Sequence, residues 1–343
     1  MRKLPFVIAG AAAVVAATAI VATAGTHPAR PGVHATPTAS SVADGPPVTP
    51  YERAVDAVNA HGMRIWLETD LVKRWLAGKD QFAQGVAMVS TLAKRPGVVG
   101  IKIADELGYR DGLNSPDKIR SFLSDSATAL RKAAPGKKIL VDLLVPELGC
   151  APDHQPPLRW ATICAVQLHG QYPQLDMDQV DSYLSSGDID VLDLSTGLLN
   201  DRTYSGWGLD MAAAQRTAWA EARTRGWDTK VKLQARKALA HPGKYTATDT
   251  GDQLSTFVDI PLSDGALAVD VWTWHQQYQG DMYRLLDPGL KRNALWDELV
   301  KRHATGADLF THMSPQSLEV GLDADLGVLS QVFTDVFVAA GTG

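Results

Sequence analysis

Short runs of apolar residues alternate along this chain with longer stretches of helical periodicity. The clearest apolar run is Val98-Val-Gly-Ile-Lys-Ile-Ala-Asp-Glu106, which ends in two adjacent carboxylates. An amphipathic stretch that closes at Pro96-Gly97 precedes it, and a polar loop follows it. A short apolar run bounded by turn residues is typical of a buried strand in a parallel sheet. The pattern therefore predicts a helix, a strand, a polar strand end and a loop, in that order.

The same order recurs along most of the chain. The pattern predicts strands at 63–70, 98–106, 138–147, 165–169, 189–195, 229–238, 266–274 and 307–313. It predicts helices at 51–60, 81–94, 115–134, 178–185, 209–225, 252–261, 288–303 and 323–338. The strand at 165–169 has the weakest pattern, since almost no helix separates it from the strand before.

Strands separated by helices pair in parallel through right-handed crossovers. Unit size and number predict an α/β fold, a (β/α)8 TIM-type barrel over residues 50–343. A Rossmann-like open sheet is the alternative. No strand is followed by a G-x-G-x-x-G loop, which argues against that alternative.

The first 49 residues have a different composition from the rest. Arg2 and Lys3 precede an apolar stretch that ends at Ala22-Thr-Ala24, which predicts a signal peptide over residues 1–24. An uncleaved membrane anchor is the alternative, because the apolar stretch approaches the length of a membrane span. Residues 25–49 are rich in Pro, Thr, Ser, Ala and Gly, which predicts a disordered linker. We therefore expect a secreted, extracellular protein without stable membrane association after cleavage.

The two cysteines, Cys150 and Cys164, are consistent with an exported protein. An even cysteine count in an exported chain favours a disulfide, and two free buried thiols are the alternative. Neither cysteine has a histidine at metal-ligand spacing, so we expect no metal and no cofactor. The net charge of −5 gives no reason to expect nucleic acid or an anionic membrane as a partner.

Alternation predicts which side chains enter the barrel. The outward face of each strand packs on helices, and the other face points into the lumen. Since Ile101 and Ile103 suit the outward face, Lys102 and Glu106 are expected in the lumen. The other strands are expected to add Arg64, Trp66, Glu68, Asp142, Asp193, Lys232, Gln234, Arg236, Asp270, Trp272 and Trp274. Charges are costly to bury unpaired, so Lys102 and Lys232 are expected to pair with neighbouring acids.

This collection of side chains suggests a chemistry. Carboxylates at the carboxyl ends of barrel strands lie where TIM barrels hold catalytic residues. Two carboxylates with separated pKa values are the minimum for glycoside hydrolysis. Trp272 and Trp274, followed by His275, would offer apolar platforms for sugar rings beside hydrogen-bonding groups. The alternative is that both tryptophans fill the core at the barrel mouth.

Two short motifs carry a resemblance. Ile103-Ala-Asp-Glu106 resembles the Asp-Glu strand end of secreted barrel families related to glycoside hydrolases, and Trp272-Thr-Trp274 is similar to their aromatic late strand. This chain departs from the large retaining clan, which has Asn-Glu at the first motif and a late nucleophilic Glu. The resemblance implies Glu106 as acid, with Asp142 or Asp193 as its partner. The expected substrate-binding residues are Glu68, Asp105, Arg236, Gln234, Trp272, Trp274 and His275.

The sequence thus predicts a secreted glycan-active hydrolase with a carbohydrate substrate. A non-catalytic barrel that binds glycans or cell wall is one alternative, in which Lys102, Lys232 and Arg236 neutralise the acids. A phosphodiesterase-type barrel is another, for which only His275 and His312 are candidates.

Overall fold

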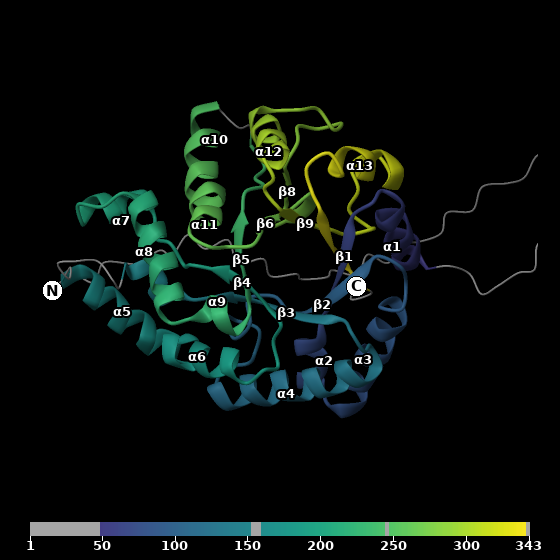
Figure 1. The fold of residues 1–343 in the computed structure, drawn as a ribbon, viewed down its shortest axis with the longest axis horizontal. Coiled ribbons are helices and arrows are strands. Elements are labelled where there is room, and N and C mark those ends of the chain that lie inside the picture. Colours follow the sequence, from purple (N-terminus) through teal and green to yellow (C-terminus); the bar gives the residue numbers. More distant parts are fainter. Residues whose placement is uncertain (1–48, 152–158, 244–246, 341–343) are drawn as a thin grey trace, which may run out of the picture.

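A computed structural model describes residues 49–151, 159–243 and 247–340 of the chain. Eight parallel strands close into a barrel in the order β1-β10-β9-β6-β5-β4-β3-β2, and helices surround it (Figure 1). The predicted (β/α)8 barrel is therefore confirmed. The expected signal peptide over residues 1–24 and most of the linker over residues 25–49 lie outside the described residues. No helix in the described part of the chain is long and apolar enough to cross a bilayer.

The barrel strands are short, five residues being the commonest length. They are β1 (Arg64–Glu68), β2 (Val98–Ala104), β3 (Lys138–Leu144), β4 (Val191–Ser195), β5 (Lys232–Ala238), β6 (Val269–Trp272), β9 (Leu309–Met313) and β10 (Asp335–Ala339). An antiparallel hairpin, which the pattern does not predict, follows β6. It consists of β7 (His275–Tyr278) and β8 (Asp281–Arg284).

The longer helices cover the outside of the barrel, and single turns connect them to strands. The α-helices are α1 (Pro50–Ala60), α2 (Leu71–Ala77), α3 (Lys79–Leu92), α4 (Pro116–Ala133), α5 (Arg159–Gln171), α6 (Met177–Ser185), α7 (Asp201–Gly206), α8 (Met211–Thr224), α9 (Trp227–Lys230), α10 (Ala247–Leu254), α11 (Ile260–Ser263), α12 (Ala294–Ala304) and α13 (Leu322–Leu329). Shorter turns are η1 (Pro146–Cys150), η2 (Pro173–Leu175) and η3 (Ser255–Asp259).

Two predicted elements are wrong. One predicted strand is part of a helix, and part of one predicted helix is a strand, so the predicted number of barrel strands is unchanged. The predicted strand at 165–169 belongs to α5, whose buried residues Ala161, Cys164 and Leu168 recur at helical spacing. The predicted helix at 323–338 ends at Leu329, and the last barrel strand, β10, follows it. Val336, Phe337 and Val338 are all buried, so both faces of β10 are apolar and no alternation reveals it.

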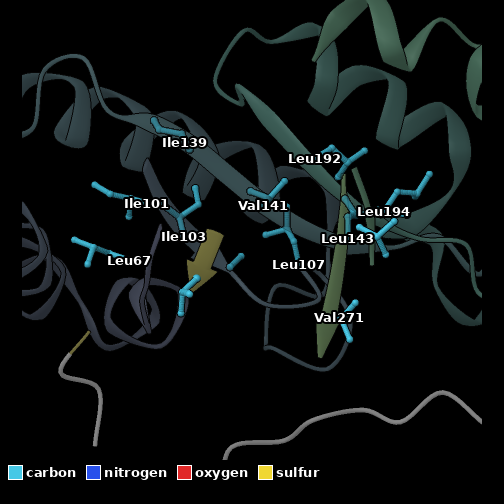
Figure 2. Close-up of a cluster of buried hydrophobic side chains, with 14 of the residues drawn as sticks. Leu67, Ile101, Ile103, Leu107, Ile139, Val141, Leu143, Leu192, Leu194 and Val271 are labelled. Carbon is cyan, nitrogen blue, oxygen red and sulfur yellow. The ribbon is translucent and has the colours of Figure 1, made fainter. Parts of the chain in front are cut away.

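The outward faces of the strands form the main core. Ile101 and Ile103 of β2 and Val141 and Leu143 of β3 pack with the buried faces of the surrounding helices (Figure 2). Burying an aliphatic side chain of this size contributes about 1.5–3 kcal/mol. The predicted alternation is confirmed for these strands, and it leaves the other face of each strand in the lumen.

A second apolar layer fills the amino-terminal half of the lumen. We call it the plug, and its buried members are Trp66, Leu140, Val191, Ala268, Phe310 and Phe337. Trp66 lies against Phe310 and Phe337, with ring centroids 6.4 and 6.2 Å apart. Beside Trp66 stands Gly100 of β2, and a Cβ atom there would overlap the indole ring and approach Lys138 O to 2.8 Å. The absent side chain of Gly100 therefore makes room for the largest ring of the plug.

The expected disulfide between Cys150 and Cys164 is present, with Cα atoms 5.7 Å apart. It joins η1, directly after β3, to α5. Tyr204 reinforces this corner, because its hydroxyl donates to Gly149 O at 2.6 Å.

The plug gives a first prediction. Gly100→Ala should lower the free energy of unfolding by about 1–3 kcal/mol, because overpacking forces Trp66 and the barrel wall apart. Urea unfolding monitored by tryptophan fluorescence measures the change. Gly251→Ala is the matched control, since a Cβ there meets nothing within 4 Å and Ala favours a helix. Equal stability of Gly100→Ala and wild type would contradict the tight packing of the plug.

Candidate active site

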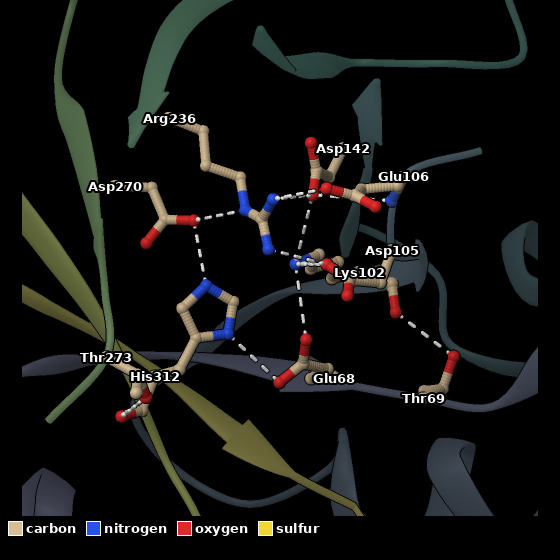
Figure 3. A network of polar contacts seen from close by, with 10 residues as sticks. All are labelled: Glu68, Thr69, Lys102, Asp105, Glu106, Asp142, Arg236, Asp270, Thr273 and His312. Atoms are coloured by element: carbon tan, nitrogen blue, oxygen red, sulfur yellow. Dashed lines mark hydrogen bonds and ion pairs between the residues drawn. The ribbon is translucent and has the colours of Figure 1, made fainter. Parts of the chain in front are cut away.

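A layer of charged side chains lies directly above the plug, toward the carboxyl ends of the strands. Since side chains on one face of a strand recur every two residues, each plug position predicts a lumen position two residues later. Trp66 is followed in this way by Glu68, and Phe310 by His312. The layer, together with the two acids after β2, comprises Glu68, Lys102, Asp105, Glu106, Asp142, Asp193, Arg236, Asp270 and His312. Figure 3 shows all of them except Asp193.

Lys102 of β2 lies at the centre of this layer, and its side chain is fully buried. Its Nζ lies 2.8 Å from Asp105 Oδ1 and 3.2 Å from Glu68 Oε1. The ring of Phe337 lies beneath it, with the centroid 5.3 Å from Nζ. Burial opposes the charged form, but the carboxylates of Asp105 and Glu68 outweigh it and raise the pKa of Lys102. The ammonium therefore stays protonated.

Arg236 of β5 is the second buried cation. Its guanidinium contacts Asp142 Oδ2 at 2.9 Å, Asp105 Oδ1 at 3.0 Å and Asp270 Oδ2 at 3.5 Å. Glu106 Oε1 lies 3.6 Å from the same group. The side chain is 7% exposed, so these carboxylates, rather than water, compensate its charge.

His312 of β9 links two acids across the barrel. Its Nδ1 lies 3.1 Å from Glu68 Oε2, and its Nε2 lies 2.8 Å from Asp270 Oδ2. The imidazole ring stacks on Phe337 with centroids 4.7 Å apart. Burial alone would lower the pKa of His312, but the carboxylates of Asp270 and Glu68 raise it to about 9. Since both ring nitrogens face carboxylates, the imidazolium donates both hydrogen bonds.

The acids of the layer separate into two groups by protonation. Burial opposes ionisation of Glu68, but Lys102 and His312 outweigh it and lower its pKa to about 2. The pKa of Asp105 is likewise lowered against burial by Lys102 and Arg236. Burial raises the pKa of Glu106, and Arg236 offsets this only in part. The adjacent residues Asp105 and Glu106 are thus moved in opposite directions.

Two further acids lie deeper in the lumen. Burial raises the pKa of Asp142 and of Asp193 well above the ordinary value, and both side chains are fully buried. Asp142 accepts from Arg236 and, at 3.3 Å, from the backbone N–H of Glu106. Neither carboxyl oxygen of Asp193 has a hydrogen-bond partner within the described ranges. Asp193 pairs in register with Asp142 on one side and Gln234 on the other.

Among the described residues of this layer, three carboxylates are the side chains most exposed to solvent. The exposed fractions of the side chains are 24% for Glu68, 30% for Asp105 and 13% for Glu106, whereas Lys102 is fully buried. The mouth therefore presents hydrogen-bond acceptors, and the cations lie beneath them. An anionic group on a substrate would meet repulsion before it reached either cation.

The structure brings together five of the predicted site residues: Glu68, Asp105, Glu106, Asp142 and Arg236. Asp193 and Gln234 lie beside them but are buried. Their burial does not support a direct role in chemistry at the mouth. The sequence interpretation placed Lys102 and Asp270 in the lumen without assigning them to the site, and considered His312 only for phosphodiesters. The two-residue spacing from the plug would have placed all three.

The expected position of the aromatic platforms is wrong. Trp274 is 2% exposed, donates its Nε1–H to Asp325 Oδ1 at 2.9 Å and packs on Trp296. Trp272 is 4% exposed and is covered by Tyr278 and Tyr283 of the hairpin. The unpredicted hairpin is the reason, because it buries the end of β6 that would otherwise form the rim.

Two polar residues also lie elsewhere than expected. His275 begins the hairpin, and its Nε2 lies 2.6 Å from Glu319 Oε2, apart from the charged layer. Lys232, the first residue of β5, is exposed and does not neutralise lumen acids. The turn α9 occupies residues 227–230, so β5 starts later than predicted.

No protein-family model and no curated protein matches the chain. A candidate phosphonomutase from Burkholderia cenocepacia is 14% identical, with a TM-score of 0.43 and coverage of 84% of this chain and 92% of that chain. A 2,3-dimethylmalate lyase of the PEP mutase/isocitrate lyase superfamily is 12% identical, with a TM-score of 0.41 and coverage of 86% and 82%. A pyruvate carboxylase from Rhizobium etli is 12% identical, with a TM-score of 0.42; the match covers 84% of this chain but only 24% of that one.

These descriptions contradict the prediction of a glycan-active hydrolase, since they name a mutase, a lyase and a carboxylase and no glycosidase. The resemblance to glycoside hydrolases therefore holds only as a barrel fold. The geometry supplies a physical reason for the error. Asp142 and Asp193, which were expected to act as partners of Glu106, are fully buried. The tryptophans that were expected to bind sugar rings are covered. At these identities the likeness concerns the fold alone, so no activity is transferred from these proteins.

His312 makes stability depend on pH. The pKa of His312 is about 9 in the folded chain and 6.5 when unperturbed, so its contribution is complete below pH 6.5 and is lost as pH rises through 9. The stability difference between wild type and His312→Gln should shrink by up to about 3 kcal/mol over that interval. Urea unfolding at a series of pH values measures it. A difference that stays constant with pH would show that His312 is not protonated.

The buried cations and buried acids should respond differently to mutation. Arg236→Met removes the charge that opposes several carboxylates and should cost about 3–5 kcal/mol. Asp142→Asn keeps an acceptor for Arg236 and should cost less than Arg236→Met, because burial raises the pKa of Asp142 and already opposes its charged form. Arg225→Met is the control, since Arg225 also contacts three carboxylates but is 22% exposed, outside the barrel. Thermal unfolding ranks the variants, and equal losses for Arg236→Met and Arg225→Met would contradict the burial argument.

Proposed function

We propose that the chain is an acid–base enzyme whose reaction takes place at the mouth of the barrel, with Glu106 as the residue that carries the proton. The observation that supports this is the opposite displacement of the pKa values of two adjacent acids, Asp105 and Glu106. Acid–base enzymes create such a split so that one carboxyl group can donate a proton while its neighbour stays ionised.

The backbone at Glu106 supports the same assignment. Its φ of 48° lies in the left-handed region, which a non-glycine residue adopts only when its surroundings hold it there. Asp142 supplies the restraint through both its groups. Its carboxylate accepts the N–H of Glu106 at 3.3 Å, and its carbonyl accepts the N–H of Leu107 at 2.9 Å. Asp142 is a positioning residue in this proposal.

The partly exposed side chains limit the substrate. Glu68 and Asp105 are ionised and can only accept hydrogen bonds, so a bound molecule must donate them. Hydroxyl, amide and ammonium groups meet this demand, and phosphate does not. We therefore propose a small neutral or cationic substrate rich in donors, on which Glu106 moves a proton. A carbohydrate fits as a hydroxyl-rich molecule, without hydrolysis of a glycosidic bond.

We propose that the protein acts outside the cell. The basic and apolar start of the sequence supports export, and the disulfide between Cys150 and Cys164 supports an oxidising compartment. The acidic mouth and the net charge of −5 support neither nucleic acid nor an anionic membrane as a partner.

Glu106→Gln tests the proposal. Wild-type protein in D2O should catalyse incorporation of carbon-bound deuterium beside the carbonyl group of at least one member of a panel of hydroxyketones and reducing sugars, followed by NMR. Glu106→Gln should lower that rate by about 100-fold or more, because an amide cannot carry the proton. Glu221→Gln is the matched control, since Glu221 is a half-buried acid paired with Arg225 at 2.7 Å on the outside of the barrel. No incorporation into any compound, or an unchanged rate in Glu106→Gln, would overturn the proposal.

A further inference from the structure

A second cluster of metal-ligating side chains lies outside the charged layer. Glu147 of η1, His169 of α5 and Asp176 at the start of α6 each direct one donor atom to a common point, with all three atoms within 4.8 Å of one another. Among the described residues, these three side chains form the group whose donor atoms are close enough together to bind one metal ion. The donors are one imidazole nitrogen and two carboxylate oxygens.

The spacing of the donors fits a small divalent ion. His169 Nδ1 lies 3.5 Å from Glu147 Oε1 and 2.6 Å from Asp176 Oδ2. Ligands that are each about 2.1 Å from a tetrahedral Zn²⁺ stand about 3.4 Å apart. The first distance already has this value, and the second reaches it by a side-chain movement of about 1 Å. Three protein ligands would leave the fourth position to a water molecule.

The charges of the cluster are unbalanced without an ion. Two carboxylates face the same nitrogen of His169, and one N–H cannot satisfy both. Glu147 is 7% exposed, and its Oε2 accepts the N–H of Met177 at 3.4 Å. Glu147 and Asp176 therefore share a single ring nitrogen of His169 between two carboxylates.

The scaffold holds the ligands in place. The disulfide between Cys150 and Cys164 joins the two elements that carry Glu147 and His169. Asp176 caps α6 with Oδ1, which accepts the N–H of Asp178 at 2.6 Å, and so leaves Oδ2 for the cluster. A site whose ligands are prepositioned loses less entropy when it binds an ion.

We infer that Glu147, His169 and Asp176 form a binding site for a divalent transition ion of the Zn²⁺ class. The mixed nitrogen and oxygen donors favour Zn²⁺ over the hard ions Mg²⁺ and Ca²⁺, which prefer oxygen alone. The site is independent of the proposed acid–base chemistry at Glu106. It differs from the expectation, drawn from the sequence, that the protein binds no metal.

Isothermal titration of the untagged chain with Zn²⁺ tests this inference. Wild type should bind one ion per chain, and both His169→Gln and Asp176→Asn should bind it more than about tenfold more weakly. Saturating Zn²⁺ should also raise the thermal unfolding temperature of wild type and leave that of His169→Gln unchanged. Mg²⁺ in the same titration should give no comparable heat.

The variants are chosen to keep the fold. The side chain of His169 is 58% exposed, and Asn at position 176 can still cap α6. Asp210→Asn is the matched control, because Asp210 also caps a helix, with its Oδ1 at 2.6 Å from Ala213 N of α8, but is not a member of the cluster. Absence of saturable Zn²⁺ binding in wild type, or equal binding by wild type and His169→Gln, would overturn the inference. Weakened binding in Asp210→Asn would assign the effect to helix capping and would overturn it as well.

Discussion

A fully buried ammonium group is the constraint on which the upper half of the barrel depends. Lys102 has no contact with water, and an unpaired charge in such a place would cost far more than the stability of a domain of this size. Glu68 and Asp105 compensate it at 3.2 and 2.8 Å. These two acids must therefore stay ionised, and the remaining charges of the lumen arrange themselves around that requirement.

The requirement extends to every other member of the layer. Arg236 shares Asp105 Oδ1 with Lys102, His312 contacts the other oxygen of Glu68, and both cations also contact Asp270. Six acids then face three cations, and burial raises the pKa of Asp142 and of Asp193, which opposes their charged forms. Glu106 also lies at the mouth, 13% exposed, and burial raises its pKa while Arg236 offsets this in part. The lysine at the centre thus determines the electrostatic surroundings of the proposed reactive group.

Much of this arrangement could be predicted from the sequence, because strands with one apolar and one polar face reveal their orientation. Ile101 and Ile103 identify Lys102 as a lumen residue, and Val141 and Leu143 identify Asp142. The method fails where both faces are apolar, as in β10, and where a short segment supports two periodicities, as at 165–169. It also fails for Trp272, because a hairpin that forms its own sheet decides whether that ring is exposed. Tertiary contacts, rather than local pattern, determine these three features.

The loop after β2 gives a reason to propose that the reactive group lies at the mouth and not deeper in the lumen. Every cation in the lumen is already compensated, so a ligand that entered there would have to displace an ion pair. The loop, in contrast, is held by its own hydrogen bonds. Asp111 accepts the N–H groups of Gly108 and Leu113 at 2.9 Å, and Gln174 donates to Gly108 O at 2.8 Å. A prepositioned loop keeps Glu106 in its left-handed conformation without a bound ligand, so the energy of binding is available for the reaction.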